Sequence, residues 1–529
     1  MALDAQATRA VDQMAEHILE ARHEEVARDF CDLLREGAPA LELERVGLRT
    51  ASPFLNVPAH IMVKPDGELR GVNYDHTIMG IWRSLKLSTL MPKGYEYLPF
   101  AQAMWYLPQG LDIWSQILCE FPGHYAREQE KCPTITIRGP KQHFEEYPPQ
   151  IEGSFEDRLG QLFHSIVEGD KVAAFRVFLG LAEEAQHDDA KRKALEAEVL
   201  CAALIDLPGP RLRTGLLVNP AHKAIRTRAM IDLANAFGWE RAYPAFFVVI
   251  PDLCNNPRSY EMSEAAHGML RANFGPDYRE LRHTNTGTFD GREAEEFITA
   301  LQQGTPDEAL GHVTRLLREG KSLVAINDVC VLATARIMTW IENPSMTTGG
   351  FFNVTHCMDY ANVAGFWLRR YDHPQQVKAA YLVAHHVNDT ARFLRFTAQN
   401  SVEGLGVAEQ ARERAGAFAE LSLKQARERL AAACSGQDAP SAMALTGAYL
   451  ERTHERKALI QTLAFETAKI EGDPHLPRLG SSHFEEYSHS HLPGRMRDDF
   501  LRSWSHYVAF CRRRSDRFDC LHTYEDALL

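Results

Sequence analysis

The sequence predicts an all-α protein: a large multi-helix body with a minor β-hairpin near the amino terminus. Three observations support this fold class. Apolar residues return every three or four positions over most of the 529 residues, which is the period of a helix buried on one face. Several of these stretches begin with helix caps, such as Thr305 before Pro306 and Asp290 before a glycine. Strand patterns are few: residues 60–72 predict a hairpin and residues 133–137 a short strand.

The expected helices follow one another along the whole chain, each with its own apolar period. They cover residues 4–36, 77–89, 155–185, 189–205, 221–238, 260–273, 292–303, 306–319, 322–341, 355–370, 374–397, 403–434, 440–470 and 495–513. Joints rich in proline, glycine or polar residues fall at 140–152, 275–291 and 472–494. We therefore expect three segments packed as one globule: an N-terminal helical segment with the small β elements (1–150), a central helical body with the metal site (151–400) and a C-terminal helical appendage (401–529).

The composition is that of a folded, acidic protein. With 58 Lys and Arg against 71 Asp and Glu, the formal charge is 58 − 71 = −13, and 45% of the residues are hydrophobic, which excludes a disordered chain. The negative charge argues against a nucleic-acid or an anionic-membrane partner. The ten cysteines are widely spaced, which predicts reduced thiols. The first residues lack a signal-peptide pattern and no apolar run approaches about 18 residues, so we expect a cytoplasmic location.

Three histidines occupy the start of an expected apolar helix. His76 opens the second expected helix, His222 lies in the first turn after a proline, and His356 leads the helix at 355–370. An ionisable side chain on an apolar helix must be paired, neutralised or bound to a ligand. Metal sites in helical bundles take one or two inward-facing side chains from each of several helices. A metal site is therefore one interpretation, and histidines satisfied within the core are the other.

A fourth segment, residues 378–389, combines a lysine with two histidines on one apolar helix. Lys378 and His385 share a face because they are two turns apart, while His386 lies about 100° from His385. Asp389 is placed to orient either imidazole through its second nitrogen. A lysine among apolar neighbours either extends to the surface or loses its proton. In the second case it serves as a base, as a nucleophile or, after carbamylation, as an anionic metal ligand.

Three further side chains are candidates for the same site. His312 lies early in the amphipathic helix expected at 306–319. Asp328 interrupts an apolar run where an acid needs a partner; Arg336 is the ordinary partner, and a metal or a positioned ligand is the alternative. Tyr360 lies close to His356 and is a candidate catalytic residue. Aromatic side chains near the proposed ligands either stack an aromatic substrate or fill the core: Trp82, Trp105, Phe351, Phe352, Tyr360 and Trp367.

Other metal-like patterns have simpler explanations. Cys520 and His522 form half of a Rieske motif whose second half is absent. Glu264 and His267 form one Glu-x-x-His pair with apolar company, whereas a di-iron site needs two such pairs and two further glutamates. The chain has no dinucleotide-binding, P-loop or nucleophile-elbow motif. A histidine tract among Ser, Glu and Gly predicts a solvated loop: His483, His489 and His491.

Three motifs, in this order, resemble the questin-oxidase-like family. They are NYDHTIMGIW at 73–82, NPAHKAIRTRAMIDLANAFGW at 219–239 and FFNVTHCMDYANVAGFWLRRYDHPQQVKAAY at 351–381. The family includes fungal enzymes that oxidatively open anthraquinone rings, and related helical modules that are fused to Rieske domains in bacteria. The resemblance, over roughly residues 70–395, implies an all-helical fold. It also implies a mononuclear non-haem iron bound by histidines and, in at least one member, by a carboxylated lysine.

Carried over residue by residue, the resemblance implies four metal ligands. His76 matches the amino-terminal ligand motif, His222 the central one and His356 the histidine of the VTH segment. Lys378 matches the lysine that is carboxylated.

The resemblance leaves a further histidine ligand open and departs from the family pattern in two places. His312 and His386 compete for that position, with His385 beside the second. Family members often carry a second histidine four residues after the central one, where this chain has Arg226. The Rieske domain of the fused relatives is absent, so electrons would come from the substrate or from a separate donor.

Together these observations favour an oxidoreductase: a mononuclear non-haem Fe(II) oxygenase that acts with O2 on an organic small molecule, with aromatic compounds as one class. A metal-free or NADPH/flavin-assisted oxidase is an alternative, with Lys378 and the histidines as acid and base groups. A non-catalytic helical scaffold or binding module, with structural histidines, is the other alternative. The sequence indicates neither the substrate nor the oligomeric state.

Overall fold

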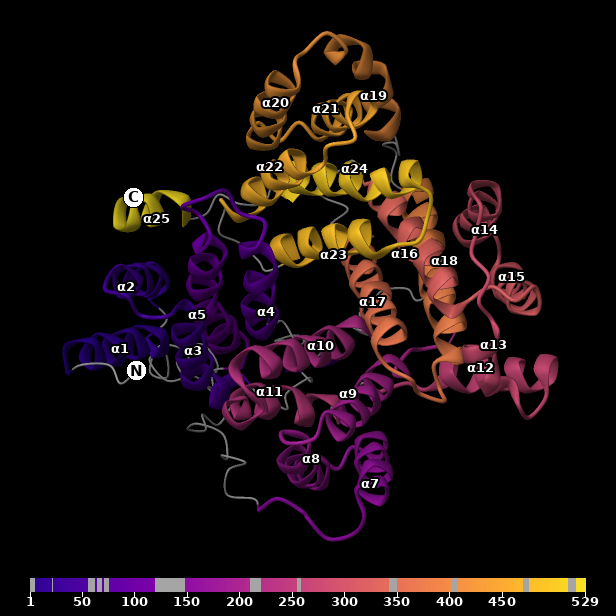
Figure 1. Cartoon of the computed structure of the whole chain (residues 1–529), viewed down its shortest axis with the longest axis horizontal. Helices are drawn as coiled ribbons and strands as arrows, with labels where there is room; N and C mark the ends of the chain where they lie inside the picture. Colours follow the sequence, from indigo (N-terminus) through magenta and orange to yellow (C-terminus); the bar gives the residue numbers. More distant parts are fainter. Residues whose placement is uncertain are drawn as a thin grey trace.

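The computed structural model describes residues 5–20, 22–55, 62–63, 69–70, 76–118, 148–209, 220–254, 258–341, 350–400, 407–469, 475–511 and 520–529. The protein is all-α, with α4, α10, α17 and α23 near its centre (Figure 1). The helices of the first half are α1 (Ala5–Leu19), α2 (His23–Arg35), α3 (Ala40–Leu55), α4 (Thr77–Ser88), α5 (Leu98–Leu118), α7 (Phe155–Glu168), α8 (Lys171–Ala185), α9 (Asp189–Leu204), α10 (Pro220–Phe237), α11 (Tyr243–Leu253) and α12 (Glu261–Phe274). Those of the second half are α13 (Leu281–Thr284), α14 (Gly291–Gln303), α15 (Pro306–Arg318), α16 (Leu323–Met338), α17 (Gly350–Arg370), α18 (Val377–Asn400), α19 (Val407–Ala415), α20 (Leu423–Ser435), α21 (Ala439–Arg452), α22 (Lys457–Ala468), α23 (His475–His489), α24 (Gly494–Cys511) and α25 (Cys520–Leu528). Short 3-10 helices are η2 (Trp239–Arg241), η3 (Tyr278–Glu280) and η5 (Gly416–Phe418).

Local capping explains where several helices begin and end. The expected helix at 155–185 is two helices, because Gly169 ends α7 with a φ of 83° and the Asp170 carboxylate accepts a hydrogen bond from the first turn of α8. The caps predicted at Asp290 and Thr305 are confirmed, and each is a complete capping box with the glutamate three residues later. Short polar side chains therefore set these boundaries within an otherwise continuous apolar pattern.

Several helices lie where the sequence pattern predicts none: α3, α5, α11, α13, α23 and α25. Helix α11 has no polar face for a periodic pattern to mark, because every residue from Pro244 to Leu253 is buried. Helix α23 falls in the stretch that was expected to be the C-terminal loop at 472–494. Tertiary packing, rather than local amphipathicity, stabilises helices of this kind.

The described β structure is one antiparallel pair of two-residue strands, β1 (Met62–Val63) and β2 (Leu69–Arg70). A pair this short does not support the β decoration expected at residues 60–72. The strand expected at 133–137 lies outside the described residues.

The central helices join distant parts of the chain. Helix α10 packs against α4, α9, α11 and α17, and α23 packs against α4, α17 and α24. Helix α25 returns to α2 and α5 (Figure 1). Helices of the expected C-terminal segment thus contact helices of the other two segments, while the boundaries at 150 and 400 stay a prediction. No described helix combines the length and the apolarity that crossing a membrane requires.

The described cysteines with a free thiol are all buried: Cys31, Cys201, Cys254, Cys330, Cys357, Cys434 and Cys520.

Candidate metal centre

Three histidines come together where α4, α10 and α17 begin. His76 is the N-cap residue of α4, so the helix starts immediately after it. His222 lies in the first turn of α10, which begins at Pro220, and His356 lies in the second turn of α17, which begins at Gly350. Helix α10 packs against both α4 and α17 (Figure 1), and the contacts among the three imidazoles bring these amino-terminal turns together.

The three side chains face one another through the same ring atom. The Nε2 atom of His222 lies 3.2 Å from Nε2 of His76 and 2.8 Å from Nε2 of His356. One nitrogen from each ring lies within 4.8 Å of the other two. All three residues are at most 5% exposed. Within the described ranges this is the one group of three or more His, Cys, Asp or Glu side chains spaced to hold a metal ion.

The surroundings keep the central imidazole uncharged. Burial, followed by the neighbouring His356 and His76, lowers the pKa of His222 well below its ordinary value. The guanidinium groups of Arg226 and Arg478 lower it further. A neutral imidazole offers a nitrogen lone pair, which is the form that binds a metal ion.

The spacing of the nitrogen atoms fits the chemistry of a bound transition metal. Two nitrogens about 2.1 Å from one ion lie roughly 3.0–3.4 Å apart when the angle between them is octahedral or tetrahedral. The two short separations around His222, 2.8 and 3.2 Å, lie close to this range. Imidazole donors suit iron, zinc, copper and nickel. The donor set therefore fits a metal ion without selecting among these four.

His312 does not join the cluster. On α15 its ring lies 5.2 Å, between centroids, from the ring of Phe297, and it contacts the guanidinium of Arg315 one turn further along. The sequence pattern placed this histidine near the site because α15 is amphipathic, but the helix presents it to α14 and to its own last turns.

Asp328 does not join the cluster either, and its expected partner was wrong. It is buried on α16 and accepts hydrogen bonds from Arg369 Nη1 at 3.0 Å and from the backbone N–H of His491 at 2.8 Å. Arg336 instead pairs with Glu295 and, at its Nε atom, with an acid on α24. The acid is thus satisfied by a salt bridge and a loop contact, not by a metal.

Lys378 is too far along α18 to bind the same ion. Its Nζ donates to Ser263 Oγ on α12 at 3.2 Å, and burial lowers its pKa. Cys357, the neighbour of His356, is hydrogen-bonded to Thr390. From 378 to 390 the helix advances 12 residues, or about 18 Å at 1.5 Å per residue, so the lysine reaches the other end of α17. Of the two alternatives for this lysine, the structure has a partly buried side chain with a lowered pKa, but it does not bring that side chain to the histidines.

The two histidines of α18, His385 and His386, contact different residues. His385 Nε2 is 3.1 Å from the carbonyl oxygen of Pro208. His386 packs its ring at 85° against Tyr360, which donates its hydroxyl to the carbonyl of Leu204 at 2.5 Å. Burial, followed by His385, lowers the pKa of His386 to about 3, and its Nε2 has no hydrogen-bond partner among the described residues. Tyr360 and His386 thus form a buried, neutral pair one helical turn from His356.

Four of the expected aromatic side chains are buried in the core: Trp82, Trp105, Tyr360 and Trp367. Trp82 and Trp367 are fully buried, and Trp82 donates its indole N–H to Asp232 at 2.7 Å. The side chains of Phe351 and Phe352 lie outside the described part of the chain.

The weaker histidine patterns also find ordinary partners. His483, expected in a solvated loop, is fully buried in α23, where its ring contacts Leu479 O at 2.6 Å and Ser503 Oγ at 3.1 Å. His267 contacts the hydroxyl of Tyr278 at 2.8 Å, and the glutamate three residues before it is exposed. Neither position contributes to a metal site.

A stripe of polar side chains runs along α17 from His356, as the sequence of this segment predicts. Asp359, Asn362 and Arg369 follow His356 along the helix, and the first two are fully buried. Polar residues three, four or seven positions apart on an apolar helix share one face. That spacing marks the stripe in the sequence, but it does not indicate which residues of other helices the stripe contacts.

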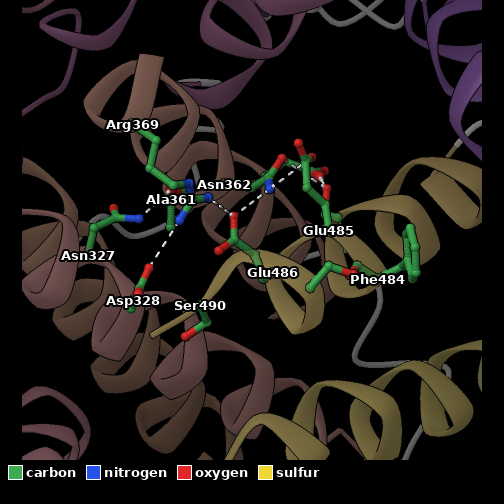
Figure 2. Close-up of polar contacts among 12 residues, drawn as sticks. Asn327, Asp328, Ala361, Asn362, Arg369, Phe484, Glu485, Glu486 and Ser490 are labelled. Atoms are coloured by element: carbon green, nitrogen blue, oxygen red, sulfur yellow. Dashed lines mark hydrogen bonds and ion pairs between the residues drawn. The ribbon is translucent and has the colours of Figure 1, made fainter. Parts of the chain in front are cut away.

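Charged residues of α23 (Figure 2) and of α10 contact this stripe. Asn362 donates from Nδ2 to Glu486 at 2.6 Å and accepts from Arg228 Nη1 at 2.6 Å. Arg228 also binds Glu485, and Arg369 donates to Glu486 at 2.8 Å. Arg83 of α4 joins them through Ser482 and Glu485, so a buried polar network ties α23 to all three helices that carry the histidines.

No family model, no curated protein and no solved structure matches this chain significantly. The fold and the site describe an all-α protein in which three buried histidines meet near the amino-terminal ends of three helices.

Proposed function

We propose that the chain is a mononuclear non-haem Fe(II) oxygenase that uses O2 to oxidise an organic small molecule, with aromatic compounds as the first class to test. One observation supports this proposal: the Nε2 atoms of His76, His222 and His356 face one another in a buried position where His222 is held neutral. Neutral imidazoles gathered in this way are a ligand set for a transition metal.

Hydrogen bonding alone accounts less well for these contacts. The Nε2 atom of His222 touches two other Nε2 atoms, at 2.8 and 3.2 Å. An imidazole nitrogen carries either one hydrogen or one lone pair in the ring plane, so it serves one such contact fully. A metal ion would accept a lone pair from each of the three rings.

Iron would supply a site for the reduction of O2 by electrons from the substrate or from a separate donor. His76, His222 and His356 would hold it and leave positions open for substrate and O2. Buried side chains next to the ligands, such as Met79 and Ile225, would exclude water. The choice of iron over zinc, copper or nickel rests on the resemblance to questin-oxidase-like proteins.

The test is metal content, measured on protein reconstituted with Fe(II) without oxygen and then desalted. We expect about one iron per chain, as a single ligand cluster holds one ion. His76→Ala, His222→Ala and His356→Ala should each lose most of it while the helical circular dichroism persists. His373→Ala is the matched control, because His373 lies in the loop between α17 and α18 and its imidazole contacts Glu198 on α9.

The outcomes separate the alternatives. Iron retained by all three variants, or absent from the wild type, would contradict the proposal. In that case a bound flavin would indicate the metal-free or flavin-assisted oxidase. A chain without metal or flavin, whose histidine variants lose only stability, would indicate the scaffold. Binding of zinc alone would keep the metal site and rule out the oxygenase.

A further inference from the structure

Arg478, in the first turns of α23, contacts two of the helices that carry the three-histidine cluster, α4 and α17. Its Nη1 atom is 3.6 Å from Sδ of Met79, three residues after His76 on α4. Its Nε atom is 2.5 Å from Oδ2 of Asp359, three residues after His356 on α17. The guanidinium therefore contacts residues one helical turn after two of the histidines, and its charge also lowers the pKa of the third, His222.

The guanidinium of Arg478 is buried with donors left over. The residue is 0% exposed. An arginine has five N–H donors, whereas the acceptors given to it by the described part of the chain are one carboxylate and the weakly accepting sulfur of Met79. Its Nη2 atom is buried without a hydrogen-bond partner there. A buried cation with unused donors is unfavourable unless a further acceptor fills the position.

The carboxylate that faces Arg478 is shared with other groups. Asp359 accepts a hydrogen bond from Ser482 Oγ at 2.7 Å and lies 3.9 Å from a guanidinium nitrogen of Arg83. One carboxylate thus faces two buried guanidinium groups. Arg83 also lies 3.8 Å from Glu485, whereas Asp359 is the one carboxylate that the described residues give to Arg478.

We infer that Arg478 binds an anionic oxygen of the substrate, a carboxylate or a phenolate, next to the metal. The inference rests on the proposed function and narrows its substrate class to organic anions. Guanidinium groups bind such oxygens through charge-assisted hydrogen bonds, and Nη2 has the free donors. The metal and Arg478 would then hold the substrate at two points, which fixes its orientation.

The experiment measures the binding of model anions to the full chain by calorimetry, in the metal-free and the Fe(II)-loaded states without oxygen. Benzoate and 4-nitrophenolate are the probes, and benzamide and nitrobenzene are their neutral counterparts. We expect at least one anion to bind about tenfold or more tightly than its counterpart, because charge-assisted hydrogen bonds are about twice as strong as neutral ones. Which anion binds tells the carboxylate from the phenolate.

Arg478→Met should remove most of that preference, and Arg478→Lys should keep part of it, since an ammonium retains the charge but not the planar pair of donors. Arg336→Met is the control, because that arginine pairs with Glu295. Equal binding of anions and neutral compounds by the wild type would overturn the inference even if Arg478→Met failed to fold. Unchanged anion binding by a folded Arg478→Met would overturn it too. A wild type that binds no iron would contradict the proposed function, while anion binding by the metal-free chain would still decide the role of Arg478.

Discussion

Asp328 on α16 accepts a hydrogen bond from Arg369 on α17 at 3.0 Å, in the buried network that reaches α23 (Figure 2). Burial and the neighbouring Glu486 raise the pKa of Asp328 to about 6, although Arg369 and His491 act in the opposite direction. The same guanidinium binds Glu486 at 2.8 Å, so one cation is shared by two carboxyl groups. The network therefore contains a carboxyl group, that of Asp328, whose surroundings favour its protonated form.

Asp328→Asn should change how stability depends on pH. The pKa of Asp328 is about 6 in the folded chain against 3.8 ordinarily, so its carboxyl binds a proton more tightly when folded. Its contribution to the free energy of unfolding therefore falls as pH rises from about 4 to 6 and is constant above. The unfolding free energy of the variant minus that of the wild type should rise by roughly 2–3 kcal/mol across this window. Urea unfolding at pH 4 and pH 7 measures it, with the exposed Asp526→Asn as control; a difference independent of pH would contradict the prediction.

His483→Gln should have the opposite pH dependence. Burial lowers the pKa of His483 from 6.5 to about 4, so the unfolded chain binds the proton more tightly and the wild type loses stability as pH falls between these values. Glutamine can keep polar contacts to Leu479 and Ser503 without titrating. The variant should gain roughly 3 kcal/mol relative to the wild type between pH 7 and pH 4. The same unfolding series measures this, with the exposed His522→Gln as the control substitution; a flat difference for His483→Gln would refute it.

Two helical glycines should respond oppositely to alanine. A Cβ atom on Gly180 in α8 would lie 1.9 Å from the carbonyl oxygen of Gln150, so Gly180→Ala must displace backbone and should cost about 2 kcal/mol or more. A Cβ on Gly268 in α12 would meet no described atom within 4 Å, so Gly268→Ala should stabilise by about 0.5–1 kcal/mol. Thermal unfolding of the two variants checks both signs. Similar shifts in one direction would mean that the contact of Gln150 with α8 is absent.

The histidine cluster could be predicted because its signal is local. Each of His76, His222 and His356 lies near the start of an apolar helix. A polar residue in that position can be identified from the sequence of the segment alone. Lys378 and His312 carry the same kind of signal but lie elsewhere. The direction in which a helix points its side chains, and which end of its neighbour it reaches, depend on tertiary packing that no single segment encodes.

Helix α23 shows a second limit of pattern reading. Its buried side is largely polar, and four of its polar side chains are fully buried: Arg478, Ser482, His483 and Glu486. Hydrophobic periodicity indicates helices by their apolar face. The sequence of a helix that buries charged and hydroxyl groups therefore resembles that of a solvated loop. The ionic network and Arg478 were missed for the same reason, since their partners come from α4, α10 and α17, far away in the sequence.

Lys378→Ala should leave metal binding intact, contrary to what the resemblance to questin-oxidase-like proteins implies. The lysine lies about 18 Å along α18 from the turn that contacts the neighbour of His356, which exceeds the reach of a lysine side chain with or without a carbamate. Its loss removes one hydrogen bond to Ser263 and should lower the unfolding free energy by about 1 kcal/mol. Iron content after anaerobic reconstitution is the measurement, with His356→Ala as the variant that should lose the ion. If Lys378→Ala also lost the ion while its helical circular dichroism and unfolding midpoint stayed near those of the wild type, the lysine would have to reach the metal, and α18 would need a different register against α17.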